Sequence, residues 1–478
     1  MGKGFFRQDQ IASKINLNTP NHAQCGKCKL KDTCMSPKMP PTGNFRVPLY
    51  QLAEAPGGWE DQKNEQLVGA SGQFHRRVMR RLGFHIDDGL KDNANRCHPP
   101  ENKKPTKTQM QCCRPNVVET IKTYKPHVII AMGEMAVKSL IDHKFQGDIG
   151  EIGKWQGAII PDREYQAWIC PTFHPSYVIR DTSPKAVERI YEENLRHALQ
   201  MLDVPLPYYI FENEEDKIEI LKHPKEINKF MKKLVHFHDV RLTAFDYETS
   251  GLKPHREGHK IRTCSISWGP DHAVAFPIVK SPDFHKYLAR YLASTDIMKM
   301  AADLKYEKAW SESVLGMNVN GWKFDTQLGA HVLDNRPKIT SLEYQNYVNF
   351  GVEPYDESVK KYIKPNKSAG GNEFNYIDQC DLRELLLYNG MDSMTEFRLG
   401  IVMMARMGIE YQHLFNAVSP EMLAPQYFKI LERGSGGDEK KSKSSSEKQG
   451  KRSKKAKGQQ KRRKADGENV PRKKASKR

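Results

Sequence analysis

Four carboxylates and a tyrosine in the second half of the chain have the spacing of a metal-dependent site. Asp246 and Glu248 lie two residues apart in FDYETSGL, at the end of a short apolar strand. Alternate residues of a strand face the same side, so both carboxylates share one face of a sheet, where their repulsion calls for a divalent cation. Glu307 and Asp392 follow later, and Tyr388 precedes Asp392 by four residues, which puts these two side chains on one helical face.

A second chemical signal is a group of cysteines in the first quarter of the chain. Cys25 and Cys28 have the CxxC spacing of a metal-binding knuckle, and Cys97 and Cys113 can complete a set of four thiolates. Four thiolates suit a tetrahedral Zn²⁺ ion or an iron–sulfur cluster, and the spacing alone does not separate the two. The total of nine cysteines is odd, which argues against a disulfide framework.

Two α/β units are predicted to position these residues. The first alternates strands and helices, at 47–53, 72–82, 116–123, 126–133 and 134–142. The second has strands at 241–245, 261–268 and 272–277, a helix at 282–293, and a long helix or helix pair at 383–407. Pro205 and Pro207 mark a linker. We therefore expect domains at 1–205 and 206–433, followed by a tail at 434–478.

The positive charge is concentrated in that tail. The chain of 478 residues has a formal net charge of +18, and residues 434–478 contain 18 Lys and Arg against 5 Asp and Glu, or 18 − 5 = +13. The tail has no aromatic residue, so it cannot bury a core and is expected to be disordered. Contact with polyanions, nuclear import and simple solubilisation are the alternatives for its role.

Membrane and secreted proteins are excluded by the same survey. No segment approaches the roughly 18 uncharged apolar residues of a membrane helix, and the N-terminal residues lack the apolar stretch of a secretory signal. We expect a protein of the cytoplasm, or of the nucleus if the basic tail is an import signal.

The acidic motifs resemble the DEDD family of proofreading 3′–5′ exonucleases, in the tyrosine-bearing version found in A-family DNA polymerases. The resemblance covers about 208–433, in FDYETSGL, DLKYEKAW with the following FDTQLGAHVLD, and YNGMDS. It implies a ribonuclease H-like fold with two Mg²⁺ or Mn²⁺ ions held by Asp246, Glu248, Glu307 and Asp392. It also implies that Tyr388 orients the attacking water. Glu307 stands where the family usually has Asp, and Asp303 where it has Asn, so we expect activity with altered metal geometry.

The first unit resembles the family-4 uracil-DNA glycosylases, which have a three-layer α/β/α fold and carry a [4Fe-4S] cluster. Five ordered stretches carry the resemblance: AEAPGGWED (53–61), LVGASG (67–72), DNANRCHPPENKKPT (92–106), HVIIAMGEMAVKSL (127–140) and FHPSYVIR (173–180). By this alignment the cluster ligands are Cys25, Cys28, Cys97 and Cys113. Cys34 and Cys112 are then bystanders or alternates.

The implied chemistry is hydrolysis of an N-glycosidic bond after the base is flipped into a pocket. Glu54 would position the water and the departing sugar cation, and Asn93 would read the edge of uracil. His174 would stabilise charge that develops on the uracil oxygen, with Ser176 beside it in the HPS motif as a substrate-binding residue.

Two departures from this pattern concern substrate binding. Leu67 stands where the family stacks a Phe on the base, which removes about 1–3 kcal/mol of stacking. Ala53 replaces the first Gly of its loop and adds a Cβ where nucleic acid approaches.

The combined prediction is a DNA-processing protein with a glycosylase-like unit and a metal-dependent 3′–5′ exonuclease unit, similar in arrangement to the N-terminal part of a phage A-family DNA polymerase. Single-stranded DNA, 3′ ends and uracil-containing DNA are the expected substrates. No polymerase motif follows, so we expect no DNA synthesis, and a separate polymerase is a candidate partner. The alternative is a DNA-binding accessory protein whose first unit recognises uracil without excising it.

Overall fold

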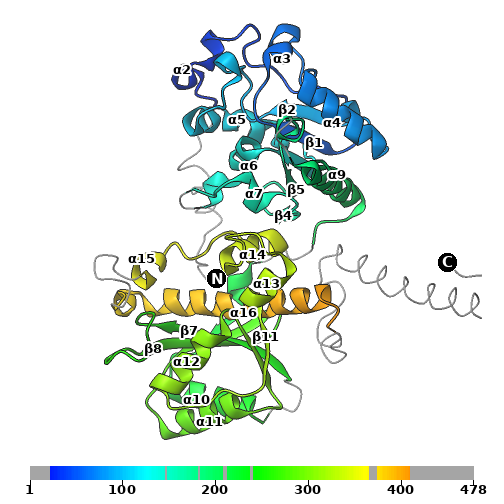
Figure 1. The fold of residues 1–478 in the computed structure, drawn as a ribbon. Helices are drawn as coiled ribbons and strands as arrows, with labels where there is room; N and C mark the ends of the chain where they lie inside the picture. Colours follow the sequence, from blue (N-terminus) through cyan, green and yellow to red (C-terminus); the bar gives the residue numbers. More distant parts are fainter. Residues whose placement is uncertain are drawn as a thin grey trace, which may run out of the picture. The chain divides into compact units, whose positions relative to one another are not determined.

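The computed structural model describes residues 22–145, 148–180, 184–207, 213–236, 241–364 and 374–409 (Figure 1). Within these ranges the chain forms two separate β-sheets with helices packed against them, which agrees with the two α/β units predicted from the sequence. The expected tail at 434–478 lies outside the described residues, and the domain boundaries stay a prediction. No helix in the described ranges is long and apolar enough to cross a membrane.

The first sheet has five strands in the order β2-β1-β3-β5-β4, and all neighbours are parallel except β4 and β5. Its strands are β1 Leu49–Ala53, β2 Leu90–Asn93, β3 Val128–Met132, β4 Ile160–Asp162 and β5 Ala167–Thr172. Its helices are α2 Cys25–Cys28, α3 Gly58–Lys63, α4 Ala70–Arg81, α5 Lys107–Tyr124, α6 Glu134–Ile141, α7 Ile152–Trp155, α8 Pro175–Val178 and α9 Lys185–Gln200.

Alternating strand residues build two cores on the two faces of this sheet. In β1, Tyr50 and Leu52 join one core with residues of α5 and α6, whereas Leu49 and Ala53 join the other with residues of α4 and α9. The same alternation continues through β3, whose residues are all buried. Because a strand buried on both faces needs apolar residues throughout, the run VIIAM is explained by this helix–sheet–helix layering.

The second sheet has six strands in the order β11-β10-β7-β8-β9-β6. Its strands are β6 Ile218–Ile220, β7 Leu242–Thr249, β8 Ile261–Gly269, β9 His272–Pro277, β10 Met298–Ala301 and β11 Trp322–Asp325. The helices that follow the linker are α10 Pro224–Leu234, α11 Pro282–Ala293, α12 Leu304–Val314, α13 Thr326–Leu333, α14 Leu342–Phe350, α15 Lys360–Ile363 and α16 Leu382–Arg406.

The two faces of the second sheet are covered differently. Apolar side chains of α10, α11 and α12 form a core with strand residues such as Phe245 and Tyr247. The long helix α16 crosses the opposite face, where it contacts β7, β8 and β9 (Figure 1). Residues 246 and 248 of β7 therefore face α16, because they alternate with Phe245 and Tyr247.

Two expected helices differ from the structure. The helix expected at 116–123 is the second half of α5, which passes through Pro115 and begins at Lys107 because Thr106 and Gln109 form a capping box. The long helix or helix pair expected at 383–407 is one helix, α16, which begins where the Asp381 side chain accepts hydrogen bonds from two backbone N–H groups.

Helix α14 contributes to the core of the first sheet although it comes late in the chain. Tyr344 and Tyr347 of this helix, and Ile339 just before it, belong to the core cluster that contains Tyr50. The Tyr347 hydroxyl also donates to Asp162 at the end of β4, over 2.8 Å. The core on that face of the first sheet is thus completed by residues 339–347.

Candidate functional sites

The first candidate site lies at the carboxyl edge of the parallel strands in the first sheet. Glu54 follows β1, Asn93 ends β2, Gly133 follows β3, and His174 lies just beyond β5. The strand order reverses between β1 and β3. The next strand after β1 is added on one side of this pair, as β2, and the strands after β3 are added on the other side. In open α/β sheets this reversal is the usual place for a ligand, so the fold gathers three of the predicted residues at one edge.

Glu54 is in close contact with Gly133 at this edge. A Cβ atom built on Gly133 would lie 2.5 Å from Oε1 of Glu54, and Gly133 has a φ of +94°, which disfavours any residue with a side chain. Gly133 also precedes the first turn of α6. The glycine therefore gives the carboxylate of Glu54 its space next to the N-terminal end of a helix.

The hydrogen bonds of His174 define which ring nitrogen carries its proton. The backbone N–H of Ser176 donates to Nδ1 of His174 over 3.2 Å, and the Ser176 hydroxyl lies 2.7 Å from the same atom. Burial lowers the pKa of His174 despite the opposing charge of Glu54. A neutral ring with an accepting Nδ1 has its proton on Nε2, which makes that nitrogen a hydrogen-bond donor.

Asn93 is buried and is held from one side only. Its Nδ2 donates to Oε1 of Gln66, whereas its Oδ1 has no hydrogen-bond partner among the described residues. A buried acceptor without a partner is costly unless a ligand satisfies it. Gln66 was not predicted from the sequence, because a glutamine before LVGASG matches no catalytic pattern.

Leu67 occupies a different environment from Glu54 and His174. It is 4% exposed, has a φ of +55°, and belongs to the core cluster that contains Phe74 and Val78. The structure therefore buries this predicted substrate-binding residue in the core beneath α4. Ser176 lies beside His174 as its motif predicts.

Five of the six cysteines in the first quarter of the chain line one cavity. The cavity is lined by all four predicted ligands and by Cys112, with Leu30 and Asn95 also in its wall. Burial raises the pKa of Cys97 and of Cys113 to about 11. Cys34 is outside the lining but close enough to Cys97 to raise the pKa of that thiol further.

The spacing of the sulfur atoms bears on which metal group fits. In a tetrahedral zinc site the thiolates lie about 3.8 Å apart, given Zn–S bonds of about 2.3 Å. Among the described residues, no three cysteine sulfurs lie within 4.8 Å of one another. The donor set, four predicted thiolate ligands around one cavity, is compatible with a bound metal ion or an iron–sulfur cluster.

Asn95 adds a polar group to the cavity wall that the sequence did not identify. It is 1% exposed, and neither Nδ2 nor Oδ1 has a partner among the described residues. Its backbone N–H donates to the Glu54 carbonyl over 3.0 Å, so it links the cysteine cavity to the strand-edge site. A buried amide without partners is compatible with a polar or sulfur-containing group in the cavity.

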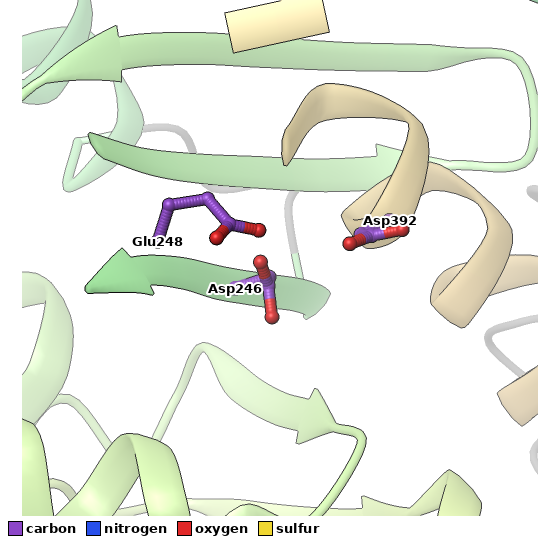
Figure 2. Close-up of side chains that lie close together, drawn as sticks. All are labelled: Asp246, Glu248 and Asp392. Atoms are coloured by element: carbon purple, nitrogen blue, oxygen red, sulfur yellow. The ribbon is translucent and has the colours of Figure 1, made fainter. Parts of the chain in front are cut away.

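The second candidate site is formed by three carboxylates from β7 and α16. One oxygen from each of Asp246, Glu248 and Asp392 lies within 4.8 Å of the other two. Figure 2 shows the three side chains converging, two from the strand and one from the helix. Three converging carboxylates are the ligands expected for Mg²⁺ or Mn²⁺.

The electrostatics of this site call for a cation. Burial raises the pKa of Asp246, Glu248 and Asp392, in the last case to about 7, and mutual repulsion raises the first two further. The ionised site is therefore unfavourable without a positive charge. The three carboxylates therefore suit a divalent cation, whose charge would offset their repulsion.

Glu307 lies near the three carboxylates without joining them. It is 1% exposed, and its Oε2 has no partner among the described residues. Burial and then the charge of Asp246 raise its pKa. The structure thus brings three of the four predicted carboxylates within ligand distance and leaves the fourth beside Asp246.

Further residues of this site follow from the fold and not from a motif. Asn389 donates to Oδ2 of Asp246 over 2.6 Å, and Asp392 accepts a hydrogen bond from Tyr355. The Tyr388 hydroxyl, one turn earlier on α16, is near enough to oppose the rise in the pKa of Asp392. Glu396, one turn after Asp392, accepts from the backbone N–H of Ala302 over 2.7 Å. Asn389 could have been suspected from its place beside Tyr388, whereas no sequence signal marks Tyr355.

The first sheet and its helices thus form an α/β fold with a candidate ligand site at the strand edge. Residues 40–196 match the protein family described as the uracil DNA glycosylase superfamily. Among curated proteins, the type-4 uracil-DNA glycosylase of Pyrobaculum aerophilum is 32% identical over 160 residues, which are 33% of this chain and 80% of that protein. The Thermotoga maritima protein of the same name is 31% identical over 156 residues, 33% of this chain and 78% of its own. The chain belongs to the uracil DNA glycosylase superfamily.

Solved structures similar to the chain include nucleases. Brucella melitensis NrnC is 19% identical, with a TM-score of 0.28 over 41% of this chain and 85% of its own. Escherichia coli RNase D, an exoribonuclease, is 12% identical, with a TM-score of 0.28 over 40% of this chain and 45% of its own.

Proposed function

We propose that the chain is a DNA-processing enzyme with two sites, one that excises uracil and one that degrades DNA from its 3′ end. The first activity is supported above all by Glu54, Asn93 and His174 at one strand edge in a chain of this family. The second is supported by the convergence of Asp246, Glu248 and Asp392.

In the first site, each side chain has an atom available for the reaction. Asn93 keeps Oδ1 without a partner, so it can accept a hydrogen bond from the N3–H group of a flipped uracil. His174 can donate from Nε2 to the uracil oxygen on which negative charge develops. Glu54 lies close enough to affect the pKa of His174, and its carboxylate can orient water and stabilise the sugar cation.

The cysteine cavity is proposed to hold a [4Fe-4S] cluster bound by Cys25, Cys28, Cys97 and Cys113. These cysteines lie on α2, in the segment after β2 and on α5, so a bound cluster would connect the three segments. Backbone N–H groups already point at two of these sulfurs, from Lys38 to Cys97 over 3.2 Å and from Arg96 to Cys113 over 3.4 Å. Such N–H groups stabilise thiolate ligands.

In the second site, Asp246, Glu248 and Asp392 are proposed to hold Mg²⁺ or Mn²⁺, with Glu307 next to them. Held by these carboxylates, two such ions would supply the activation of a water molecule and the stabilisation of the leaving 3′ oxygen. Asn389 fixes the carboxylate of Asp246, and the Tyr388 hydroxyl lies near Asp392, where it can orient water. We propose single-stranded DNA and 3′ ends as the substrates.

One observation favours the alternative of a DNA-binding accessory protein. The family resemblance leads one to expect an aromatic ring at position 67 that stacks on the base. Leu67 has no such ring, and its side chain is packed into the core. The first unit would then recognise uracil without excising it.

Incubation with a uracil-containing oligonucleotide followed by alkali distinguishes the two functions. Excision leaves abasic sites that alkali converts to strand breaks, and Asn93→Ala should lose them while Asn228→Ala, in the second half of the chain, keeps them. Uracil-dependent binding without any strand break would favour the accessory protein.

Degradation of a 5′-labelled single strand tests the second site. We expect shortening from the 3′ end with Mg²⁺ or Mn²⁺ and none with EDTA. Asp246→Ala should lower the rate by several orders of magnitude while leaving uracil excision intact, and Tyr388→Phe should cost much less. Wild-type degradation by Asp246→Ala would exclude the proposed carboxylate site.

A further inference from the structure

Asp392 receives a hydrogen bond from a second tyrosine that lies outside its helix. The hydroxyl of Tyr355 donates to Oδ1 of Asp392 over 2.5 Å. Tyr355 lies between α14 and α15, 37 residues from Asp392 in the sequence. Tyr388, in contrast, lies on the same helix as Asp392, one turn before it.

The surroundings of Tyr355 direct its proton toward Asp392. Nδ2 of Asn346 lies 2.9 Å from Oγ1 of Thr395 and 3.4 Å from the Tyr355 oxygen, and it can only donate. The Thr395 hydroxyl has one proton of its own, and the Met391 carbonyl lies 2.8 Å away to accept it. The Tyr355 proton is therefore left for the carboxylate, which is its nearest acceptor.

Tyr355 also contacts the other tyrosine of the site. The rings of Tyr355 and Tyr388 have centroids 5.7 Å apart and are tilted by 52° to each other. Asn346 and Thr395, which hold Tyr355, are both fully buried. One side chain thus touches both Asp392 and Tyr388, and its own hydroxyl is fixed by buried neighbours.

We infer that Tyr355 is a positioning residue for the carboxylate site, one that holds Asp392 in the orientation required to bind a divalent cation. The inference rests on the proposed function of Asp246, Glu248 and Asp392 as cation ligands. Side chains that hydrogen-bond to metal ligands typically contribute about 10–100-fold to metal affinity or activity. Tyr355 therefore sets how tightly the site binds its cations.

The test is Mn²⁺ binding to the full chain without DNA, measured by isothermal titration, together with the Mn²⁺ dependence of DNA degradation. Tyr355→Phe removes only the hydroxyl, and Tyr287→Phe on α11 is the matched control. We expect Tyr355→Phe to bind Mn²⁺ about 10-fold more weakly or worse. Its nuclease rate should recover at high Mn²⁺ concentration, and the control should match the wild type.

A double substitution separates positioning from a general loss of structure. If Tyr355 acts through Asp392, Tyr355→Phe should add no further loss of Mn²⁺ affinity to Asp392→Asn, whereas a general structural role would make the two losses additive. If the wild type binds Mn²⁺ and degrades DNA, and Tyr355→Phe has the same Mn²⁺ affinity and the same nuclease rate, this inference alone is overturned. A wild type that binds no Mn²⁺ overturns the inference and the proposed nuclease together.

Discussion

Gly133 and Glu54 meet so closely that a single methyl group cannot be placed between them. A Cβ on Gly133 would lie 2.5 Å from Oε1 of Glu54 and 3.0 Å from its Cδ, on a backbone with φ +94°. Gly133→Ala should therefore displace the carboxylate of Glu54 and strain the start of α6. We expect uracil excision to fall at least tenfold, and DNA degradation by the second site to be unchanged.

The control for this prediction is Gly153→Ala, since nothing lies within 4 Å of a Cβ at that position. Strand breaks after alkali are the measurement for both variants. Wild-type excision by Gly133→Ala would mean that the position of Glu54 does not matter for the reaction.

Divalent cations should stabilise the folded chain through Asp246. A ligand that binds only the folded state adds about 2.7 kcal/mol at a hundred times its Kd. We expect Mn²⁺ to raise the melting temperature of the wild type and to leave that of Asp246→Asn unchanged. In EDTA the variant should be at least as stable as the wild type, because one of three repelling carboxylates is gone.

Asp283→Asn is the matched control for the cation experiment, because Asp283 is exposed on α11. It should keep the full response to Mn²⁺. An equal Mn²⁺ shift in Asp246→Asn would place the bound cation elsewhere.

The cysteine substitutions should divide into two groups. After anaerobic purification we expect the wild type to contain iron and sulfide and to absorb broadly in the visible range. Cys113→Ser and Cys25→Ser should lose most of this absorbance, whereas Cys34→Ser and Cys112→Ser should keep it. If Cys112→Ser lost the absorbance and Cys113→Ser kept it, Cys112 would be the ligand in place of Cys113, since both line the cavity. A colourless wild type that contains zinc would contradict the cluster.

His75 should make the chain less stable as the pH falls. Its ring is buried between the Tyr191 hydroxyl and the Gln51 side chain, 2.8 and 2.9 Å away, and burial lowers its pKa from 6.5 to about 3. Below pH 6.5 the unfolded chain binds a proton that the folded chain does not. The free energy of unfolding should therefore fall by up to about 1.4 kcal/mol per pH unit between 6.5 and about 3.

Urea unfolding of the wild type and of His75→Gln at pH 7 and pH 5 measures this contribution. Other groups titrate in the same range, so the difference between the two proteins is the informative quantity. The variant should be less stable at pH 7 and should lose less stability on acidification. Equal losses would show that His75 is protonated in the folded state as well.

Local sequence patterns were enough to predict which site residues lie together on one strand, on one helix or at one sheet edge. Strand alternation placed Asp246 and Glu248 on the same face, and helical spacing placed Tyr388 near Asp392, because both rules depend only on backbone geometry. The family motifs predicted Glu54 and His174 as site residues, and both follow strands that end at one edge.

Contacts between distant segments could not be predicted in this way. Tyr355 reaches Asp392 from a segment with no periodic pattern. Asn95 lies inside the stretch 92–106, but its spacing does not show that its side chain lines the cysteine cavity. The placement of Glu307 outside the group of three carboxylates depends on how α12 packs against the second sheet. Such distances are set by the tertiary fold, and spacing along the chain does not encode them.

The packing of α14 limits how the two halves of this chain can be inherited. Tyr344 and Tyr347 fill the core of the first sheet, and Asn346 on the same helix holds Tyr355 beside Asp392. A recombination event that exchanged only the second half would have to bring aromatic residues that fit the existing core of the first. The two halves are therefore expected to evolve as a pair, with α14 changing in step with both, and not as interchangeable modules.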